Sequence, residues 1–271
     1  MAPAGGWPTD MPHSISDVRG RVALITGAGS AEGIGFATAR LLYLAGASVV
    51  LTSTTNRIFE RQRELDPEGV RCMAHVADLT HPEQVAELVE AVIQRYGRID
   101  ILVNNAGMSQ TGQETPPAQL FHQIPFAQWQ RDIDLNLNTC VHVSQAVLPH
   151  MLAAGFGRVV NIASVTGPLV TFPGTAAYSA AKSAMVGLTR AIAHEVAGQG
   201  ITVNAVAPGW IATRSSAPEE LEAARQTPVG RPGTPEEIAR VALFLASPGC
   251  SYLTGQMLVA DGGNSLQEIK G

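Results

Sequence analysis

The sequence predicts an α/β fold, a doubly wound parallel sheet of about seven strands with helices on both faces. Short apolar runs alternate with longer segments of helical periodicity, the pattern of parallel strands joined by crossover helices. Most of these runs are apolar throughout, as expected for strands that are covered on both sides. The expected strands are residues 22–26, 48–52, 70–76, 99–103, 158–162, 202–206 and 256–259.

Length and composition agree with one domain around a large core. The chain has 271 residues, 45% of them hydrophobic, and no Pro/Gly/Ser-rich linker divides its middle. Residues 1–17 contain prolines and glycines but neither a basic start nor an apolar stretch of signal-peptide length. We expect residues 18–271 to form the domain and residues 1–17 to be a flexible N-terminal arm.

Charge, hydropathy and cysteine content exclude several classes of protein. The formal net charge is −5 and no basic run is present, which argues against a nucleic-acid partner. No apolar run approaches the roughly 18 residues that a membrane span needs. Cys72, Cys140 and Cys250 are widely spaced, without the spacing of metal ligands. Buried, reduced thiols in a cytoplasmic protein are the simplest interpretation.

Three helices are marked by their residues. Thr80 with Glu83, and Thr234 with Glu237, have the spacing of capping boxes and predict helix starts at these threonines. A helix expected over about residues 176–196 is rich in alanine and glycine. Small residues let another helix approach closely, so this face is a candidate subunit interface.

A glycine-rich loop follows the first expected strand and precedes a helix. Glycines permit a tight turn and close approach to a pyrophosphate, and the helix N-terminus offers N–H groups with a partial positive charge. Such a loop in isolation is equally an ordinary tight turn, but its place between strand and helix favours dinucleotide binding. The expected phosphate contacts are Gly27, Gly29, Ser30, Gly33 and Ile34.

The end of the second strand favours NADP(H), with NAD(H) as the alternative. NAD binders usually place a carboxylate there for the adenosine ribose. Here the chain has Ser53, Thr54, Thr55 and Arg57, which suit a 2′-phosphate better because arginine forms charge-assisted, bidentate contacts. Arg57 is alternatively a solvated residue at a helix start, and Glu32 in the glycine loop would repel a phosphate if it pointed inward.

Two further polar segments follow the third and fourth strands. Asp78, next to Leu79, could accept a hydrogen bond from the adenine amino group or cap the helix that begins near His81. Asn105, Ala106 and Gly107 lie in a small turn at the carboxyl end of the fourth strand, the edge at which doubly wound sheets bind ligands.

Tyr178 and Lys182 are a candidate catalytic pair. They are four residues apart and therefore share one face of a helix. A tyrosine has a pKa of about 10, and a nearby cation favours the phenolate. Lowering the pKa to about 7 would need roughly 4 kcal/mol, which a lysine and a bound nicotinamide ring could supply together. In isolation this spacing is common in helices.

Ser164 and Asn136 complete the candidate set. Ser164 follows the fifth strand, where its hydroxyl could donate to a substrate oxygen, or it is an ordinary turn serine. It lacks the Gly-x-Ser-x-Gly elbow of serine hydrolases. Asn136 is mid-helix, where asparagine is unfavourable, so it marks either a local distortion that holds a water or a surface position.

Together these motifs resemble the short-chain dehydrogenase/reductase family over about residues 21–263. The resemblance implies a Rossmann fold and the following roles. Tyr178 would be the general acid/base, and Ser164 would hold the carbonyl oxygen. Lys182 would lower the tyrosine pKa and bind the nicotinamide ribose, and Asn136 would anchor a water that relays protons. Further cofactor contacts would come from Pro208, Gly209, Ile211 and Thr213. Hydride transfer needs no metal, and homotetramers are common in the family.

Three departures from the family pattern stand out. Five residues separate Gly27 from Gly33, where the family usually has three. Ser164 and Tyr178 are fourteen residues apart, one more than usual, so the loop between them should bulge. The segment 108–128 is longer than is common, and we expect it to border the substrate pocket.

The expected pocket is mainly apolar, with a lid over about residues 210–232 that contains a short helical pattern. We therefore expect reduction of a hydrophobic or aromatic ketone, or oxidation of the matching secondary alcohol. Two alternatives remain: a 3-oxoacyl-carrier-protein reductase, for which few basic residues are available to receive an acidic partner, and a non-catalytic NADP-binding sensor. The expected pocket walls are Met108, Val165, Leu169, Phe172 and Trp210.

Overall fold

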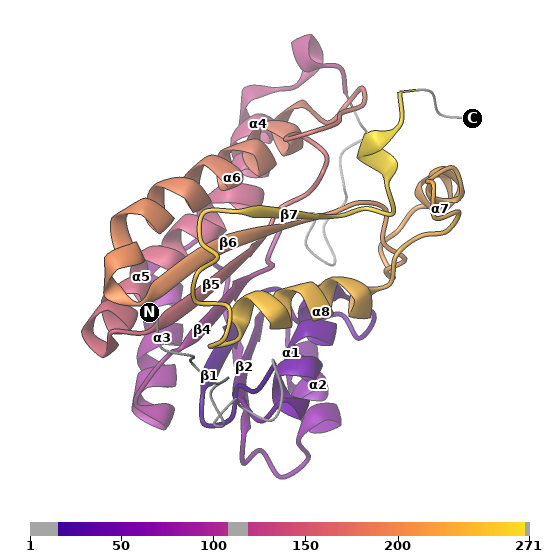
Figure 1. Ribbon diagram of the computed structural model, residues 1–271. Coiled ribbons are helices and arrows are strands. Elements are labelled where there is room, and N and C mark those ends of the chain that lie inside the picture. The colour runs from indigo at the N-terminus through magenta and orange to yellow at the C-terminus, as the bar shows by residue number, and fades with distance from the viewer. Residues whose placement is uncertain (1–15, 108–118, 269–271) are drawn as a thin grey trace, which may run out of the picture.

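The computed structural model describes residues 16–107 and 119–268, which form one seven-stranded parallel sheet (Figure 1). The strand order is β3-β2-β1-β4-β5-β6-β7, so the chain reverses direction across the sheet between β1 and β4, as in a Rossmann fold. The expected strands are confirmed, with ends displaced by at most two residues. The strands are β1 (Val22–Ile25), β2 (Ser48–Ser53), β3 (Cys72–Val76), β4 (Ile101–Asn104), β5 (Gly157–Ile162), β6 (Ile201–Pro208) and β7 (Met257–Ala260).

Helices cover both faces of the sheet (Figure 1). Helices α1, α2 and α8 pack on one face, and α3, α5 and α6 pack on the other. The helices are α1 (Ile34–Leu44), α2 (Arg57–Leu65), α3 (Pro82–Tyr96), α4 (Phe126–Ile133), α5 (Thr139–Ala154), α6 (Ala176–Val196), α7 (Pro218–Arg225) and α8 (Pro235–Ala246). A π-helical turn, Asp134–Asn138, joins α4 to α5.

Two apolar cores flank the sheet because successive strand residues point to opposite faces. In β1, Ala23 and Ile25 belong to the core beneath α1 and α8, whereas Leu24 belongs to the core beneath α3 and α5. All four residues of β1 are buried, and so are all six of β5. This burial on both sides explains why β1 is a continuous apolar run, whereas β5 is mainly apolar but also buries Arg158 and Asn161.

One of the two predicted capping boxes is confirmed and the other is wrong. At α8, the Glu237 N–H donates to Thr234 Oγ1, and the Thr234 N–H donates to Glu237 Oε2 at 2.8 Å. Helix α3 instead begins at Pro82 with His81 as its N-cap. Thr80 does not cap it, because its hydroxyl and N–H both donate to the carboxylate of Asp78.

The expectations for the N-terminal arm and for the long segment 108–128 fall partly on residues outside the described ranges. Most of the N-terminal arm, residues 1–15, lies there, and so does much of the long segment before α4. Among the helices that the structure describes, none combines the length and apolarity required to cross a bilayer.

Candidate active site

The candidate site lies at the carboxyl edge of the sheet, beside the switch point between β1 and β4. The loops that follow β1, β2, β4, β5 and β6 all reach this edge because the strands are parallel. They bring together residues that are more than 150 positions apart in the sequence. The site is therefore built from the first third, the middle and the last third of the chain.

The glycine loop after β1 is packed so tightly that side chains would not fit. Gly27 has a φ of +67°, and a Cβ there would lie 2.8 Å from Ala106 Cα. A Cβ on Gly29 would lie 2.9 Å from the Ser53 side chain, and one on Gly35 would lie 2.7 Å from the Gly27 carbonyl oxygen. Glycine at these positions thus lets the loop pack closely against the ends of β2 and β4, as expected of a dinucleotide-binding loop.

Two side chains lock this loop to the end of β4. Asn105 Nδ2 donates to the carbonyl oxygens of Thr26 and Gly27, both at 3.0 Å. In return, Thr26 Oγ1 accepts the N–H groups of Asn105 and Ala106, both at 2.9 Å. The motifs in the sequence do not by themselves mark Thr26 as part of the site. A signal was present, since it is a polar residue that directly follows an apolar strand at the edge where ligands bind.

Helix α1 begins where a phosphate is expected. It starts at Ile34 with Gly33 as its N-cap, so the cap residue has no side chain to occupy the first N–H groups. The Gly33 N–H donates to the Ser30 carbonyl oxygen at 3.2 Å. This bond forms a turn just before the helix, in the loop that is two residues longer than is usual in the family. Glu32 is exposed.

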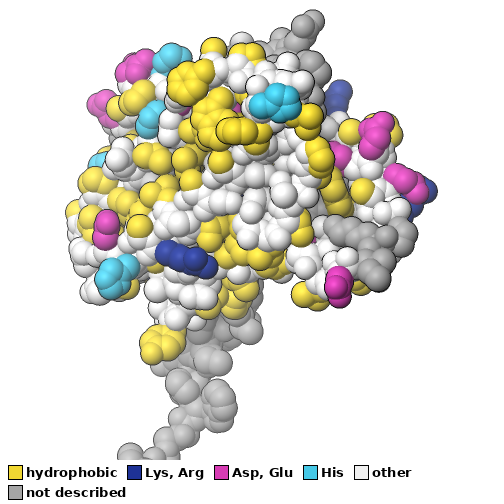
Figure 2. All heavy atoms as spheres, turned by 90° about the horizontal axis from the view of Figure 1, so that it is seen from above, with side chains coloured by type: hydrophobic (Ala, Val, Ile, Leu, Met, Phe, Trp, Pro, Cys, Tyr) yellow, Lys and Arg dark blue, Asp and Glu magenta, His cyan; other side chains and the backbone are white. Residues whose placement is uncertain are grey.

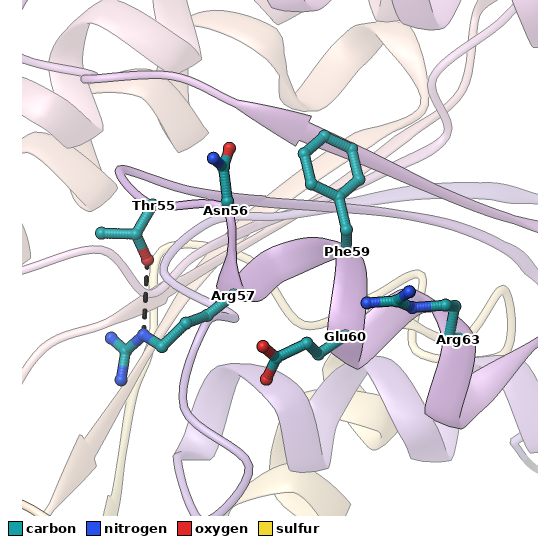
Figure 3. A pocket seen from close by; sticks show the side chains of 6 residues that line it. All are labelled: Thr55, Asn56, Arg57, Phe59, Glu60 and Arg63. Carbon is teal, nitrogen blue, oxygen red and sulfur yellow. Dashed lines mark hydrogen bonds between the residues drawn. The ribbon is translucent and has the colours of Figure 1, made fainter.

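The end of β2 forms a shallow hollow beside the first turn of α2. Figure 3 shows its lining, with Arg57 turned toward Thr55. Arg57 Nε donates to Thr55 Oγ1 at 3.3 Å, and Ser53 Oγ donates to the Thr55 carbonyl oxygen at 3.0 Å. The expected hydroxyls and arginine are therefore adjacent, with Thr54 exposed between them. The hollow is lined by Thr55, Asn56, Arg57, Phe59, Glu60 and Arg63.

Asp78 does not cap α3, whose N-cap is His81, but holds Thr80 in the preceding turn. Its Oδ1 accepts from the Thr80 N–H at 3.0 Å and from the Thr80 hydroxyl at 2.7 Å, which shapes the turn before α3. The next carbonyl, that of Leu79, lies 2.9 Å from His142 Nδ1. This contact joins the turn to α5.

Tyr178 and Lys182 lie in the first two turns of α6. Lys182 is 4% exposed, and its ammonium donates to the Ile162 carbonyl oxygen at 3.0 Å. The Nζ atom is 5.6 Å from the centroid of the Tyr178 ring. Burial lowers the pKa of Lys182 to about 8.

The pKa of Tyr178 differs from the expectation. Burial raises it, the hydrogen bond with Ser164 opposes this rise, and the Glu220 carboxylate of α7 adds to it. Lys182 was expected to lower this pKa, but in the structure its ammonium is directed to a carbonyl group and is itself penalised by burial. The residues of the chain thus favour the protonated phenol.

Ser164 forms hydrogen bonds with the backbone of its own turn and with the Tyr178 side chain. It is 8% exposed and its Oγ accepts the Thr166 N–H at 3.0 Å, so it is a turn serine as well. The longer connection to Tyr178 is absorbed by a turn in which the Gly167 N–H donates to the Val170 carbonyl oxygen at 2.7 Å. Gly167 packs directly on the Ser179 backbone, which returns the chain to the start of α6.

Asn136 lies in a helix distortion, as its unfavourable position predicted. It belongs to the π-helical turn, is buried, and its Nδ2 donates to the Asp132 carbonyl oxygen at 3.0 Å. A Cβ on Gly107 would lie 3.1 Å from Asn136 Oδ1 and 3.5 Å from Lys182 Nζ. Glycine at position 107 therefore lets the asparagine amide, the lysine ammonium and the β4 loop converge.

The expected pocket walls are only partly enclosed. Val165 is buried, Leu169 is 49% exposed and Phe172 is 45% exposed, with its ring centroid 6.0 Å from that of Trp210. Met108 lies outside the described residues. Seen from above, the molecule shows mainly apolar and uncharged atoms across the centre of the view, with most acidic side chains toward its margins (Figure 2).

The segment from β6 to α8 leaves the site and returns to it. The Ala212 N–H donates to the Gly233 carbonyl oxygen, and the Gly233 N–H donates to that of Trp210, both at 2.9 Å. Ile211 and Gly233 thus form a bridge that closes the base of a loop carrying Thr213 and α7. In the described ranges, no cluster of three or more His, Cys, Asp or Glu side chains is arranged to hold a metal ion.

The fold and this site define the class of nicotinamide-dependent oxidoreductases, and comparisons with known proteins agree. Residues 27–265 match the family described as enoyl-(acyl carrier protein) reductase. Oxidoreductase UcpA of Escherichia coli K12 is 41% identical over 268 residues, which are 94% of this chain and 98% of UcpA. The 3-oxoacyl-[acyl-carrier-protein] reductase FabG of Thermotoga maritima is 41% identical over 254 residues, 91% of this chain and 98% of FabG.

A solved structure is also similar over nearly its whole length. A putative gluconate dehydrogenase from Agrobacterium tumefaciens has a TM-score of 0.84 and 32% identity, covering 93% of this chain and 98% of that one. The chain belongs to the short-chain dehydrogenase/reductase family. It is an oxidoreductase that acts on CH–OH groups with a nicotinamide cofactor.

Proposed function

We propose that the protein reduces a hydrophobic or aromatic ketone to a secondary alcohol with NADPH, and that Tyr178 donates the proton. The convergence of Ser164, Tyr178, Lys182 and Asn136 beside the glycine loop carries this proposal. The proposed cofactor contacts are Gly27, Gly29, Ser30, Gly33, Ile34, Ser53, Thr54, Thr55, Arg57, Asp78, Leu79, Asn105, Ala106, Gly107, Tyr178, Lys182, Pro208, Gly209, Ile211 and Thr213.

When bound, the nicotinamide supplies the hydride; the remaining work falls to the side chains. The Ser164 hydroxyl hydrogen-bonds the substrate oxygen and stabilises the charge that develops there. Tyr178 gives its phenolic proton to that oxygen, and the raised pKa keeps the proton in place until it is needed. Lys182 and Asn136, which meet at Gly107, return a proton from solvent.

Replacement of Tyr178 by phenylalanine tests this mechanism. The substitution removes only the hydroxyl, so we expect kcat to fall by at least about 100-fold, the lower end of a general acid's contribution. NADPH affinity should stay within a few-fold in a fluorescence titration. A variant that retains turnover would refute the role of Tyr178 as the proton donor.

The preference for NADPH rests on the Arg57 guanidinium beside Thr55 at the end of β2, where residues 51–57 contain no carboxylate. We expect kcat/KM to be at least tenfold higher with NADPH than with NADH. Arg57→Ala should reduce this ratio by about tenfold, since a charge-assisted contact is worth roughly 1.5–3 kcal/mol. A ratio near one in the unmodified enzyme would overturn the preference.

The apolar side chains of Val165, Leu169, Phe172 and Trp210 support the choice of substrate. A panel of aromatic ketones, 3-oxoacyl thioesters on carrier protein and sugar acids, followed by nicotinamide absorbance, separates the candidates. Activity confined to small charged substrates would contradict the proposal. The relative named FabG makes 3-oxoacyl-carrier-protein reduction the second candidate; higher kcat/KM on the carrier-bound substrate than on the free thioester would establish it.

We also propose a domain over residues 18–271, a lid over residues 210–232, a homotetramer and a cytoplasmic location. The α6 helix presents a row of small exposed residues on which another helix could pack: Ala180, Ala184, Gly187 and Ala191. The cysteines Cys72, Cys140 and Cys250 are buried free thiols, as suits a reducing compartment. Light scattering coupled to size-exclusion chromatography should give four times the chain mass of 28.5 kDa.

A further inference from the structure

A chain of buried polar side chains lies beneath the site, within the apolar core. Asn104 Nδ2 donates to Asn161 Oδ1 at 2.9 Å and to Ser144 Oγ at 3.0 Å. Asn161 Nδ2 in turn donates to Thr189 Oγ1 at 2.9 Å. All four residues are at most 2% exposed. Hydrogen bonds at this depth are directional, and leaving a partner unsatisfied is costly, so they specify geometry that apolar packing alone would leave looser.

The members of this chain come from the elements that carry the candidate active site. Asn104 ends β4 and precedes Asn105 directly. Asn161 is in β5, three residues before Ser164. Thr189 is in α6, seven residues after Lys182, which is about two helical turns and places both on the same face. The Asn161–Thr189 bond therefore joins the strand that presents Ser164 to the helix that presents Tyr178 and Lys182.

Helix α6 is fastened to β5 at two points. The first is the bond from Lys182 Nζ to the Ile162 carbonyl oxygen, and the second is the bond from Asn161 to Thr189. At 1.5 Å per residue the two points lie about 10 Å apart along the helix. Two separate points on one helix fix its translation along the strand and its rotation about its own axis, which a single bond would not do.

Other hydrogen bonds fix the direction of the Asn161–Thr189 hydrogen bond. The Thr189 hydroxyl donates to the Met185 carbonyl oxygen at 2.8 Å, so it meets Asn161 as an acceptor. Asn161 Oδ1 accepts from Asn104 and from the Cys140 thiol, so its amide is held in one orientation. The Asn161–Thr189 hydrogen bond does not involve the glycine loop or the pocket walls.

We propose that Asn161 and Thr189 are positioning residues, which hold α6 in register on β5 so that Tyr178 and Lys182 face Ser164. This inference rests on the proposed function, because it assigns the register a catalytic purpose. Neither residue touches the proposed substrate pocket. Their effect should appear mainly in the rate and in its pH dependence, because only Tyr178 and Lys182 among the proposed cofactor contacts lie on α6.

Thr189→Val tests the proposal, because it keeps the shape of the side chain and removes both hydrogen bonds of the hydroxyl. We expect kcat per cofactor-binding site to fall at least tenfold, the KM for NADPH to change less than threefold, and the pH profile of kcat to shift. Thr189→Ser, which keeps the hydroxyl, should restore kcat to within about twofold. Ser144→Ala, which removes a bond of the same chain remote from α6, should leave kcat and its pH profile unchanged.

An unchanged kcat and pH profile in Thr189→Val, whether or not its Tm falls, would overturn the proposal and leave the bond a purely structural one. If this variant does not fold, Thr189→Cys takes its place, with an expected kcat below that of Thr189→Ser. Tyr178→Phe separates the two levels of inference. If that variant is inactive and Thr189→Val is not impaired, only the positioning role fails; if it remains active, the proposed function itself fails.

Discussion

Lys182→Met should make the protein more stable at neutral pH while it abolishes turnover. Burial lowers the pKa of Lys182 from its usual 10.5 to about 8. At 1.36 kcal/mol for each unit of pKa, the buried ammonium costs about 3 kcal/mol at pH 7. Methionine has a similar length and no charge, so the substitution removes this cost.

Part of the gain is offset by the lost hydrogen bond to the Ile162 carbonyl oxygen. An unsatisfied buried carbonyl costs about 1–2 kcal/mol. The net stabilisation is then about 1–2 kcal/mol at pH 7, which corresponds to a Tm increase of about 4 °C for a chain of this size.

The pH dependence has a defined sign. Between pH 8 and pH 10.5 the unfolded lysine holds a proton that the folded lysine has released, so the stability of the unmodified protein rises with pH in this window. The burial cost is fully present below pH 8 and absent above pH 10.5. The advantage of Lys182→Met should therefore shrink above pH 8 and reverse near pH 10.

Thermal unfolding of both proteins at pH 7 and pH 10 is the assay, and Arg158→Met is the contrasting variant. Burial also lowers the pKa of Arg158, but its guanidinium donates to four carbonyl groups and lies 4.4 Å from the centroid of the Phe156 ring. Its removal should destabilise the fold by at least about 3 kcal/mol. Lower stability of Lys182→Met at pH 7, or a difference that is equal at both pH values, would refute the reasoning.

Three further predictions concern the loops and a helix cap. Asn105→Ala removes two hydrogen bonds to the glycine loop, which together contribute about 2 kcal/mol. The Kd for NADPH, measured by fluorescence titration, should therefore rise by up to about 30-fold. An unchanged Kd would show that cofactor binding does not depend on these two hydrogen bonds. Gly107→Ala places a methyl group 3.1 Å from Asn136 Oδ1. We expect kcat to fall about tenfold with little change in Tm. Full activity would argue against a proton path through Asn136 and Lys182. Hydrogen bonds from Arg231 and from the Thr234 N–H lower the pKa of Glu237 to about 2. Glu237→Gln should therefore reduce the Tm by about 2 °C at pH 7, and this difference should disappear as the pH falls from 4.5 toward 2. A constant difference would exclude the charge as its cause.

Much of the architecture could be predicted from local patterns. Apolar runs such as β1 identify strands because burial on both faces favours apolar residues at successive positions. The bounds of α6 and α7 follow from helical periodicity and from prolines at helix starts. Thr80 shows the limit of such patterns. Its capping-box spacing is satisfactory, but the nearby Asp78 carboxylate competes for the same hydroxyl and takes it.

By itself, the sequence determined the class of fold, the place of the glycine-rich loop between β1 and α1, and the shared helix face of Tyr178 and Lys182, since each depends on neighbours within a few positions. The tertiary structure alone decided how these parts meet. Thr26 and Asn105 are 79 residues apart, yet they lock one loop because β1 and β4 are adjacent strands. Likewise, strand order and helix packing direct the Lys182 ammonium to a carbonyl group rather than to the phenol. Hydrogen bonds between residues far apart in the sequence depend on which strands and helices become neighbours. Local periodicity does not predict those neighbours.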